Sequence, residues 1–267
     1  MAHQDPEWSE PPPRRKRRGR TVGIVLLVLV LLLAGVLVIA DRVGASRAEQ
    51  EIAKQTASEM KARGISYDGD PRVDIGGFPF LTQVADGVYK KITISVERPR
   101  TEEVQLETMT LVAANVRAEA SDLLNGRGPV VADTITGTAT VGWEAVKTLV
   151  ELAGLPSGVD PSKLQVNVVN NDVELKLPIT LGRVNFTLKA TGKITVAEGQ
   201  VRLQLTNVGS DEVDSPIIRT AIAGFRDRLV ATIKVPQMPY KLVIKKVETT
   251  ATGVFVTAVA DKVQLAA

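Results

Sequence analysis

Cysteine is absent from this chain and histidine occurs once, and both scarcities narrow the chemistry available to it. Without cysteine there can be no disulfide, no thiol nucleophile and no thiolate metal ligand. The histidine is His3, so the remainder lacks a histidine general base, a Ser-His-Asp triad and histidine ligands for zinc or iron. We therefore expect no metal and no other cofactor. Paired carboxylates are the one catalytic class that residue counts leave open.

Net charge is scarce outside the N-terminus. Residues 1–20 carry six lysines and arginines against three acidic residues, an excess of +3 that equals the charge of the whole chain. Residues 21–267 are therefore formally neutral, which argues against a nucleic-acid-binding surface on the folded part. The chain also has no GxGxxG or GxxxxGK[ST] loop for phosphates.

What the chain does have is an uncharged run of nineteen residues, Val22 to Ala40. A helix that rises about 1.5 Å per residue would carry this run across a hydrocarbon core of roughly 30 Å. The basic residues precede it, so the positive-inside rule predicts a cytoplasmic N-terminus and an exported remainder. The alternative is a cleaved signal peptide, although its apolar region is usually about 7–15 residues long. The small residues that end at Ala45 would suit a peptidase, leaving Ser46 as the mature N-terminus.

These features divide the chain into three parts. Residues 1–20 are expected to form a disordered basic cytoplasmic tail, because a proline-rich and charged composition cannot form a core. Residues 21–41 are expected to form a transmembrane signal-anchor, and residues 46–267 the exported domain. The predicted location is the cell membrane, single-pass, with the C-terminal domain in the periplasm or cell envelope. Cleavage after Ala45 would instead give a secreted form.

Alternating apolar and polar residues predict that most of the exported part is β-structure. The clearest segment is 183–196, where every second position from Val184 to Val196 is apolar or, at Gly192, neutral. Similar segments recur on either side, joined by short turns such as Glu198–Gly199. Consecutive hairpins with one dry face describe an antiparallel sheet.

Three helices are predicted beside these strands. Ser46 and Glu49 form an S-x-x-E capping box, which predicts a helix from Ser46 to about Arg63. The second is predicted over Trp143–Ala153, and the third over Pro216–Lys234, with an apolar stripe. The members of this stripe are Ile218, Ile222, Phe225 and Leu229.

Together these patterns predict an α+β fold preceded by one transmembrane helix. Because strand twist accumulates, a large sheet must curl. We expect one long curved antiparallel sheet wrapped around the Pro216–Lys234 helix. The residue patterns alone leave two interpretations open, an ordinary packed core or a groove that accepts an apolar ligand.

The segment DIGGFPFLTQ, Asp74–Gln83, combines two of the five phenylalanines with a Gly-Gly pair and a proline. Gly76, Gly77 and Pro79 do not suit a regular helix. We expect a turn here that redirects the chain into the sheet, with Phe78 and Phe80 anchored in apolar surroundings. The preceding Asp68, Asp70 and Asp74 lack EF-hand spacing and are interpreted as solvated turn residues.

Three segments carry a resemblance to a known family. They are GGFPFLTQVADGVYKKITISV (Gly76–Val96), TATVGWEAVKTLV (Thr138–Val150) and VPQMPYKLVIKKVETTATGVFVTAVADKVQL (Val235–Leu265). They resemble the LmeA-like phospholipid-binding family of actinobacterial envelope proteins. In that family a Gly-Phe-Pro-Phe-Leu segment leads into a Gly-containing turn and a strand. A Pro-Tyr pair, here Pro239-Tyr240, opens the final hairpin.

The resemblance implies an exported protein that binds phospholipid, anionic or inositol-bearing, and that supports lipoglycan assembly in the cell envelope. It also implies a fold similar to tubular lipid-binding domains of the bactericidal/permeability-increasing type. In such domains a curved sheet wraps a long helix around acyl chains. That shape agrees with the fold expected from the patterns and favours the groove over the packed core. The implied partners are phospholipid and membrane, with no nucleic acid.

The leading hypothesis is therefore a membrane-anchored lipid-binding or lipid-transfer module that is not an enzyme. The alternative is a structural or scaffolding envelope protein that binds a protein partner without a lipid ligand. A third hypothesis is an enzyme that acts on lipid or glycan through carboxylates. The residues predicted to contact lipid are Phe78, Phe80, Leu81, Ile222, Phe225 and Leu229. Head-group contacts are expected from Lys90, Lys91 or Arg219.

Overall fold

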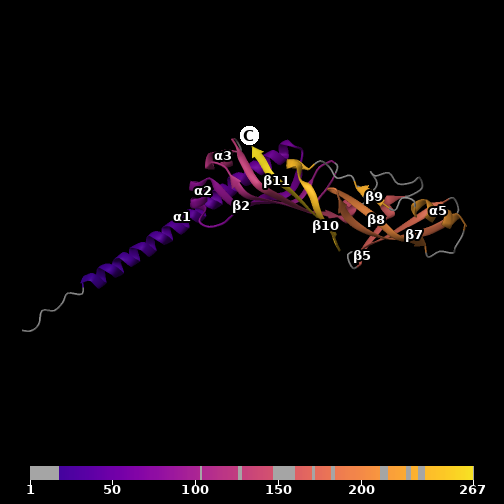
Figure 1. The fold of residues 1–267 in the computed structure, drawn as a ribbon, viewed down its shortest axis with the longest axis horizontal. Helices are drawn as coiled ribbons and strands as arrows, with labels where there is room; N and C mark the ends of the chain where they lie inside the picture. The colour runs from indigo at the N-terminus through magenta and orange to yellow at the C-terminus, as the bar shows by residue number, and fades with distance from the viewer. Residues whose placement is uncertain are drawn as a thin grey trace, which may run out of the picture. The chain divides into compact units, whose positions relative to one another are not determined.

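The computed structural model describes residues 18–102, 104–125, 128–146, 160–169, 172–181, 184–210, 216–226, 230–233 and 238–266 (Figure 1). The chain forms two compact units, Met1–Val43 and Gly44–Ala267. Helix α1, Arg18–Ala62, begins in the first unit and ends in the second.

The portion of α1 in the first unit consists largely of the apolar run. Every valine, leucine and isoleucine from Ile24 to Ile39 is 45% to 66% exposed. Within the described part of the chain, α1 is the one helix that is long and apolar enough to cross a membrane. This agrees with a signal-anchor and with a signal peptide, the two alternatives that the sequence presents.

The prediction that a helix starts at Ser46 is wrong. α1 runs without a break from Arg18 to Ala62, so Ser46 lies inside it. Glu49 does not turn back to cap Ser46; its Oε1 accepts a hydrogen bond of 2.9 Å from the Ile75 backbone N–H. Because the apolar run supplies the preceding helical turn, the N–H groups after Ser46 already have carbonyl partners and need no cap.

Six antiparallel strands form the first sheet, in the order β1–β2–β3–β4–β11–β10. Their bounds are Ser66–Gly76 (β1), Val88–Arg100 (β2), Thr108–Arg117 (β3), Val130–Gly142 (β4), Val243–Thr250 (β10) and Gly253–Ala266 (β11). Short helices α2, Phe80–Asp86, and α3, Ala120–Asn125, connect β1 to β2 and β3 to β4. The predicted final hairpin is confirmed as β10 and β11.

The register of the first sheet separates an apolar face from a polar one, because directly opposed residues share a face. One row across the sheet is Ile75, Ile92, Ala113, Ile135 and Ala260. The next row on the same face is Val73, Ile94, Leu111, Gly137, Ala258 and Ile244. Between them, on the opposite face, lie Asp74, Thr93, Val112, Thr136 and Val259. The expected dry and wet faces are therefore present.

Five antiparallel strands form the second sheet, in the order β5–β6–β7–β8–β9. Their bounds are Gln165–Val169 (β5), Asp172–Leu181 (β6), Val184–Ala197 (β7), Gln200–Ser210 (β8) and Val230–Ile233 (β9). Strand β7 confirms the clearest strand prediction. Glu198 and Gly199, with φ of 54° and 74°, form the predicted hairpin turn into β8. Single 3₁₀ turns occur at Pro161–Lys163 and Pro239–Lys241.

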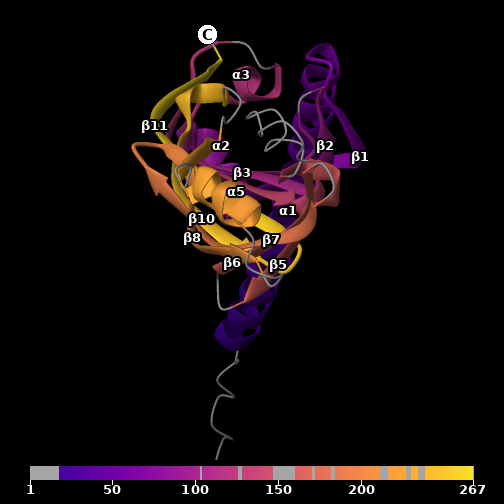
Figure 2. The same cartoon turned by 90° about the vertical axis from the view of Figure 1, so that its right-hand side faces the viewer.

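The helix predicted over Pro216–Lys234 is too long. Helix α5 spans Pro216–Arg226, and Val230–Ile233 is strand β9, paired with β8. The Val-Ala-Thr-Ile sequence has β-branched residues at three of its four positions, and these favour a strand where a neighbouring edge accepts one. Figure 2 shows α5 against the strands of the second sheet, where Ile218 is buried and Ile222 is half-buried. Residues 143–146 begin the helix predicted over Trp143–Ala153, and residues 147–153 lie outside the described residues.

The α+β class and the antiparallel strands are confirmed, but the strands belong to two sheets, not to one. Within the described strands neither sheet closes on itself, since β1, β10, β5 and β9 are edges. The alternation of residues predicted which side of each strand is dry. It could not predict which strands pair, because an apolar face is equally buried by either arrangement.

The segment Asp74–Gln83 joins β1 to α2. β1 ends at Gly76, Gly77 has a φ of 99°, and the Phe78–Pro79 peptide is cis. Helix α2 starts at once, with Pro79 as its N-cap residue, and ends at Gly87 in the left-handed conformation. The redirecting turn is confirmed, while the helix after it was not predicted. Asp68, Asp70 and Asp74 lie in β1, so their interpretation as turn residues is wrong.

Candidate functional site

The apolar face of the first sheet is covered unequally along its strands. At one end Tyr89, Val116 and Ala132, which share a row, are at most 1% exposed. Further along the sheet, the rows of Leu111 and Met109 also contain Val96, Ala258 and Ile244, which are 2% to 4% exposed, but several other apolar side chains in these rows are only half-buried. We call these half-buried side chains the apolar strip, and its members are Ile94, Met109, Leu111, Ala139, Val247 and Val256. The strip presents aliphatic surface that water still reaches.

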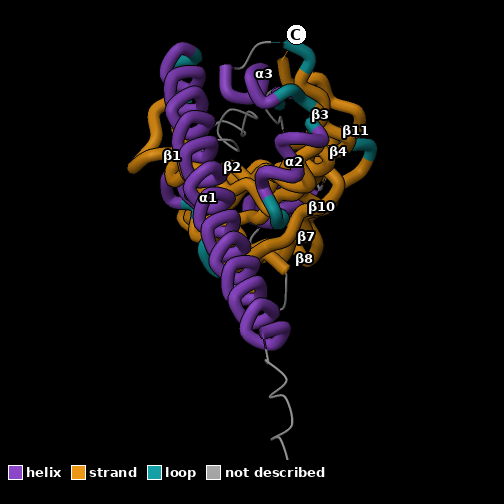
Figure 3. Tube along the Cα trace, turned by 90° about the vertical axis from the view of Figure 1, so that its left-hand side faces the viewer, coloured by secondary structure: helices purple, strands orange, loops and turns teal. Residues whose placement is uncertain are grey.

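Helices account for the well-covered end. Ala45, Ala48 and Ile52 of α1, together with Phe80 of α2, belong to the same buried cluster as Tyr89. Figure 3 shows α1 crossing the β1 and β2 region, with α2 and α3 beside it. The side chain of Gln55 in α1 donates a hydrogen bond to the Leu124 carbonyl of α3. α1 therefore packs through these apolar residues and covers this end of the sheet.

The strip has no charged member, so it can bind an apolar chain but supplies no acid, base or nucleophile. Binding to such a surface removes apolar area from water, which is worth about 25 cal/mol per Å². The composition of the strip therefore suits a hydrocarbon ligand.

Of the residues predicted to contact lipid, three lie around α2. Phe80 is buried, and its ring centroid lies 6.3 Å from that of Tyr89. Phe78 is 50% exposed and Leu81 is 42% exposed. Phe80 is therefore part of the core, whereas its two neighbours lie at the surface.

The other three predicted residues belong to α5 and the segment after it. Ile222 packs against the core of the second sheet, a cluster distinct from the one that holds Phe80. Phe225 lies in α5, but its side chain is outside the described part, and Leu229 lies outside the described residues altogether. The structure does not bring Phe80 and Ile222 into one cluster.

The three candidate head-group cations are all exposed, Lys90 and Lys91 at the start of β2 and Arg219 on α5. The two lysines lie against the glycine pair of the turn. A methyl group added to Gly76 would lie 2.8 Å from Lys91 Cε, and one added to Gly77 would lie 3.2 Å from Lys90 Cδ. The φ of 99° at Gly77 is what requires glycine there, whereas at Gly76 the flexible end of Lys91 could move aside for a larger residue.

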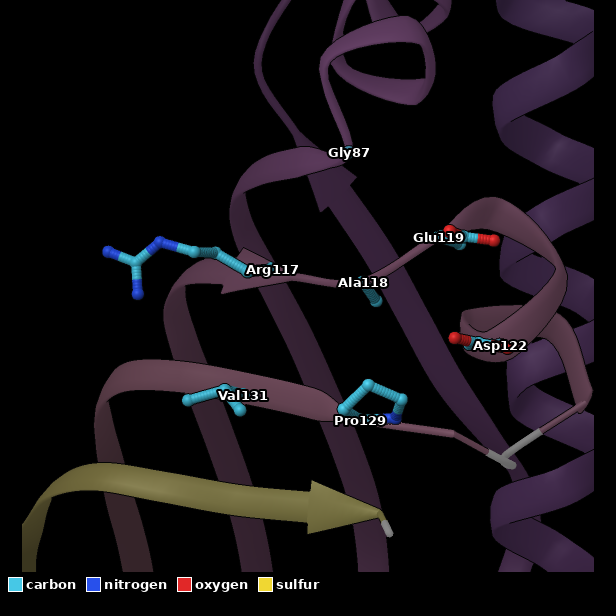
Figure 4. Close-up of a pocket in the computed structure, with 7 residues that line it drawn as sticks. All are labelled: Gly87, Arg117, Ala118, Glu119, Asp122, Pro129 and Val131. Carbon is cyan, nitrogen blue, oxygen red and sulfur yellow. The ribbon is translucent and has the colours of Figure 1, made fainter.

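A separate pocket of about 530 Å³ lies at one end of the first sheet (Figure 4). It is lined by Gly87, Arg117, Ala118, Glu119, Asp122, Pro129 and Val131. Arg117 extends away from Glu119 and Asp122 and forms an ion pair of 2.9 Å with Asp133. The two carboxylates at the pocket would repel an anionic head group, so the apolar strip is the better candidate for lipid.

Tyr89 and Asp68 of the first sheet have shifted pKa values. Burial raises the pKa of the Tyr89 hydroxyl, which lies at the covered end of the apolar face. A hydrogen bond from Arg98, with the charges of Arg98 and Arg100, lowers the pKa of Asp68. Among the described residues no group of three or more His, Asp or Glu could hold a metal ion.

The strip residues were missed at the level of sequence, although a signal exists. Met109 and Leu111 alternate with Thr108 and Thr110 at the start of β3. That alternation identifies one face of one strand. It does not reveal how much of the face the helices leave uncovered, which depends on packing in three dimensions.

Comparison with known families gives one clear match. The family model described as LmeA-like phospholipid-binding matches residues 39–259. This range contains the first two segments that carry the resemblance and most of the third, so the resemblance is confirmed. Neither a curated protein nor a solved structure matches the chain.

Proposed function

Because the chain belongs to the LmeA-like phospholipid-binding family, we propose that it binds phospholipid at a membrane to which α1 holds it. The observation that supports this most directly is the half-buried apolar strip on the first sheet. An acyl chain laid on the strip would bury apolar area of both partners. Each methylene group fully removed from water contributes about 0.8 kcal/mol.

In this proposal the acyl chains lie along the strip, against Ile94, Met109 and Leu111, and the phosphate stays at the solvent edge. Phe80 forms part of the wall at the covered end. Ile222, with Phe225 and Leu229, would extend the apolar surface from the second sheet. We propose that the two sheets together take the place of the single curved sheet in the tubular shape that the family resemblance implies.

Charge supports a preference for anionic or inositol-bearing head groups. Lys90, Lys91 and Arg219 are exposed cations on the described surface, and each would attract a phosphate more than a neutral head group. Because exposed charges are screened by salt, they select among lipids more than they add affinity.

The topology we propose follows from the charge around the apolar run. Six basic residues precede it, which favours a cytoplasmic N-terminus and a C-terminal unit in the periplasm or cell envelope. We further propose that the run is a retained anchor. Ala45 is buried in the core, and a methyl group added to Gly44 would lie 3.5 Å from the Phe80 ring. Cleavage after Ala45 would remove both residues from this packing.

At the scale of the cell, the family resemblance supports a role in lipoglycan assembly, in which this chain holds or transfers a phospholipid and catalyses nothing itself. A scaffolding protein that binds a protein partner without lipid is the alternative. The two functions differ in one measurable property, the presence of phospholipid on the apolar strip.

The proposal is tested by native mass spectrometry of the full chain after its release from detergent, followed by lipid extraction. The unaltered chain is expected to retain phospholipid. Leu111→Gln places an amide on the strip and is expected to weaken binding by about five- to thirtyfold, since it loses about 1–2 kcal/mol of apolar contact.

Val112→Gln is the matched control, because Val112 is the next residue of the same strand, is also half-buried, and faces the polar side. It is expected to leave lipid retention unchanged. The anchor is identical in both variants, so lipid that adheres to α1 cancels in the comparison. No lipid on the unaltered chain, together with no binding to anionic liposomes, would contradict the proposal and favour the scaffolding alternative.

A further inference from the structure

The turn between β1 and α2 exposes two large apolar side chains close together in the chain. Phe78 is 50% exposed and Leu81 is 42% exposed. Single exposed apolar residues are common on proteins, but a half-exposed phenylalanine next to an exposed leucine, in a chain with only five phenylalanines, is not. Their neighbour Phe80 is buried, so the turn is firmly attached to the core while its flanking residues point outward.

The position of this turn follows from its contact with α1. A methyl group added to Gly44 would lie 3.5 Å from Phe80 Cε1 and 3.8 Å from Leu81 Cδ2, so α2 rests on α1 at Gly44. Gly44 follows Ala40, the last residue of the apolar run, by four positions. Four residues span at most about 14 Å even when fully extended, and about 6 Å in a helix. Leu81 therefore lies within reach of the membrane surface if the run spans the bilayer.

Positive charge accompanies these apolar residues. The stems of Lys90 and Lys91 lie against Gly77 and Gly76, directly before Phe78 in the chain. Both side chains are exposed, and neither forms an ion pair with any residue that the structure describes. Aromatic or aliphatic side chains flanked by lysines are the composition that suits the boundary between lipid head groups and acyl chains.

We propose that Phe78, Leu81, Lys90 and Lys91 form a membrane-contact patch that docks the Gly44–Ala267 unit on the anionic surface of the bilayer crossed by α1. This inference rests on the proposed anchoring of the chain. Phe78 and Leu81 enter the head-group boundary, and the lysines contact lipid phosphates. Gly77, with a φ of 99°, forms the turn that places Phe78 next to the lysine stems.

The absence of cysteine allows a direct test, because a single introduced cysteine can carry a nitroxide spin label at one site. Phe78→Cys is labelled in the full chain and reconstituted into vesicles of phosphatidylcholine and phosphatidylglycerol. For each label we compare its collision rate with oxygen to its collision rate with a water-soluble nickel chelate. This ratio is expected to be several-fold higher for the label at position 78 than for a label at Val169→Cys. Val169 is the matched control because it is 42% exposed and belongs to β5 of the second sheet.

The double variant Lys90→Glu with Lys91→Glu reverses both charges and tests whether the lysines contribute to docking on the anionic surface. Each lysine is expected to contribute about fivefold to the ratio of docked to undocked protein on an anionic surface. The reversed variant should therefore shift the label at position 78 toward the values seen at position 169. Circular dichroism checks that the variants fold. A label at position 78 that is as exposed to water as the control overturns the docking, and an unchanged label after charge reversal overturns the role of the lysines.

Lipid retention, measured on the same preparations, distinguishes failure of the membrane-contact patch from failure of the proposed phospholipid binding. Retained phospholipid with a water-exposed label at position 78 overturns the patch and leaves phospholipid binding in place. A label immersed in the bilayer on a chain that retains no phospholipid supports the patch and counts against the proposed function.

Discussion

Individual charged side chains secure the first hairpin where its pairing is irregular. The register of β1 and β2 shifts on both sides of Asp68. The Asp68 carboxylate accepts hydrogen bonds of 2.6 Å from Arg98 Nε and 3.0 Å from Arg100 Nη2, and so joins the two strands at that point. Arg98 itself has a φ of 43°, an uncommon conformation for a residue with a side chain. One carboxylate therefore holds two arginines across the shifted part of the ladder.

The lowered pKa of Asp68 predicts a dependence on acid pH. Because the folded pKa lies below the unfolded value, the ion pairs stabilise the fold fully above about pH 4, and this stabilisation is lost as pH falls through the folded pKa. Asp68→Asn is therefore expected to lower the unfolding midpoint at neutral pH and to converge with the unaltered chain under acid conditions. Thermal unfolding of the full chain in detergent at several pH values measures this.

Asp70→Asn is the control for that measurement, since Asp70 lies in the same strand and forms no ion pair in the described structure. Its unfolding midpoint should follow that of the unaltered chain at every pH. A constant difference for Asp68→Asn from neutral to acid pH would contradict the assigned role.

At the scale of elements, the contact between α1 and α2 depends on one position that has no side chain. Gly44 lies against the ring of Phe80 and the side chain of Leu81. Phe80 in turn packs on Tyr89 of β2, so α1, α2 and the first sheet meet within one cluster. This contact holds the exposed turn at a defined place on α1.

Substitutions at Gly44 should separate the effects of size from those of helix propensity. Gly44→Ala adds a methyl group at ordinary contact distance, and should leave the free energy of unfolding unchanged or raise it by up to about 1 kcal/mol. Gly44→Leu has no room beside Phe80 and should lower that free energy by about 1–3 kcal/mol. Urea unfolding of the full chain in detergent, followed by circular dichroism, checks both. Equal stability of the two variants would mean that α2 does not pack closely on α1.

For the whole molecule, the main question is whether the apolar run stays attached to the folded unit. α1 is continuous through Ala45, and beyond that point its residues Ala48 and Ile52 are buried in the cluster of the first sheet. A peptidase that cuts after Ala45 would have to reach a buried position within a helix. This packing is the observation that supports the proposed retained anchor.

The intact mass of the protein isolated from membranes tests this directly. We expect a mass that includes the apolar run, and a chain that stays in the membrane fraction after extraction with alkaline carbonate. A mature chain that begins at Ser46 would contradict the anchored topology, and with it the premise of the membrane-contact patch.

Much of the element content could be predicted from residue patterns. The alternation around Gly192 predicted β7, and the Glu-Gly turn predicted its hairpin with β8. The patterns failed where local preference is ambiguous. The Pro216–Lys234 helix was extended through Val230–Ile233 because its apolar residues suit a helix as well as a strand, and only the edge of β8 decides between them. Helix α2 was missed because glycine and proline immediately before it indicated a turn.

The residues of the candidate site, too, were predicted only in part from the sequence. Phe78, Phe80 and Leu81 were predicted from the sequence as one group, yet the structure buries the middle residue and exposes the other two. Ile222 was grouped with them and packs in a different cluster. The apolar strip was not predicted as a site, because a half-buried leucine and a fully buried one look the same in a sequence.

By itself the sequence determined the family, the apolar run, the antiparallel strands and the dry side of each strand, since all of these depend on residues near one another in the chain. Only the tertiary structure decided that the strands form two sheets, that α1 continues into the folded unit, and that part of one apolar face stays half-buried. Those properties arise from contacts between segments far apart in the chain, and burial is a property of such contacts, not of any one segment.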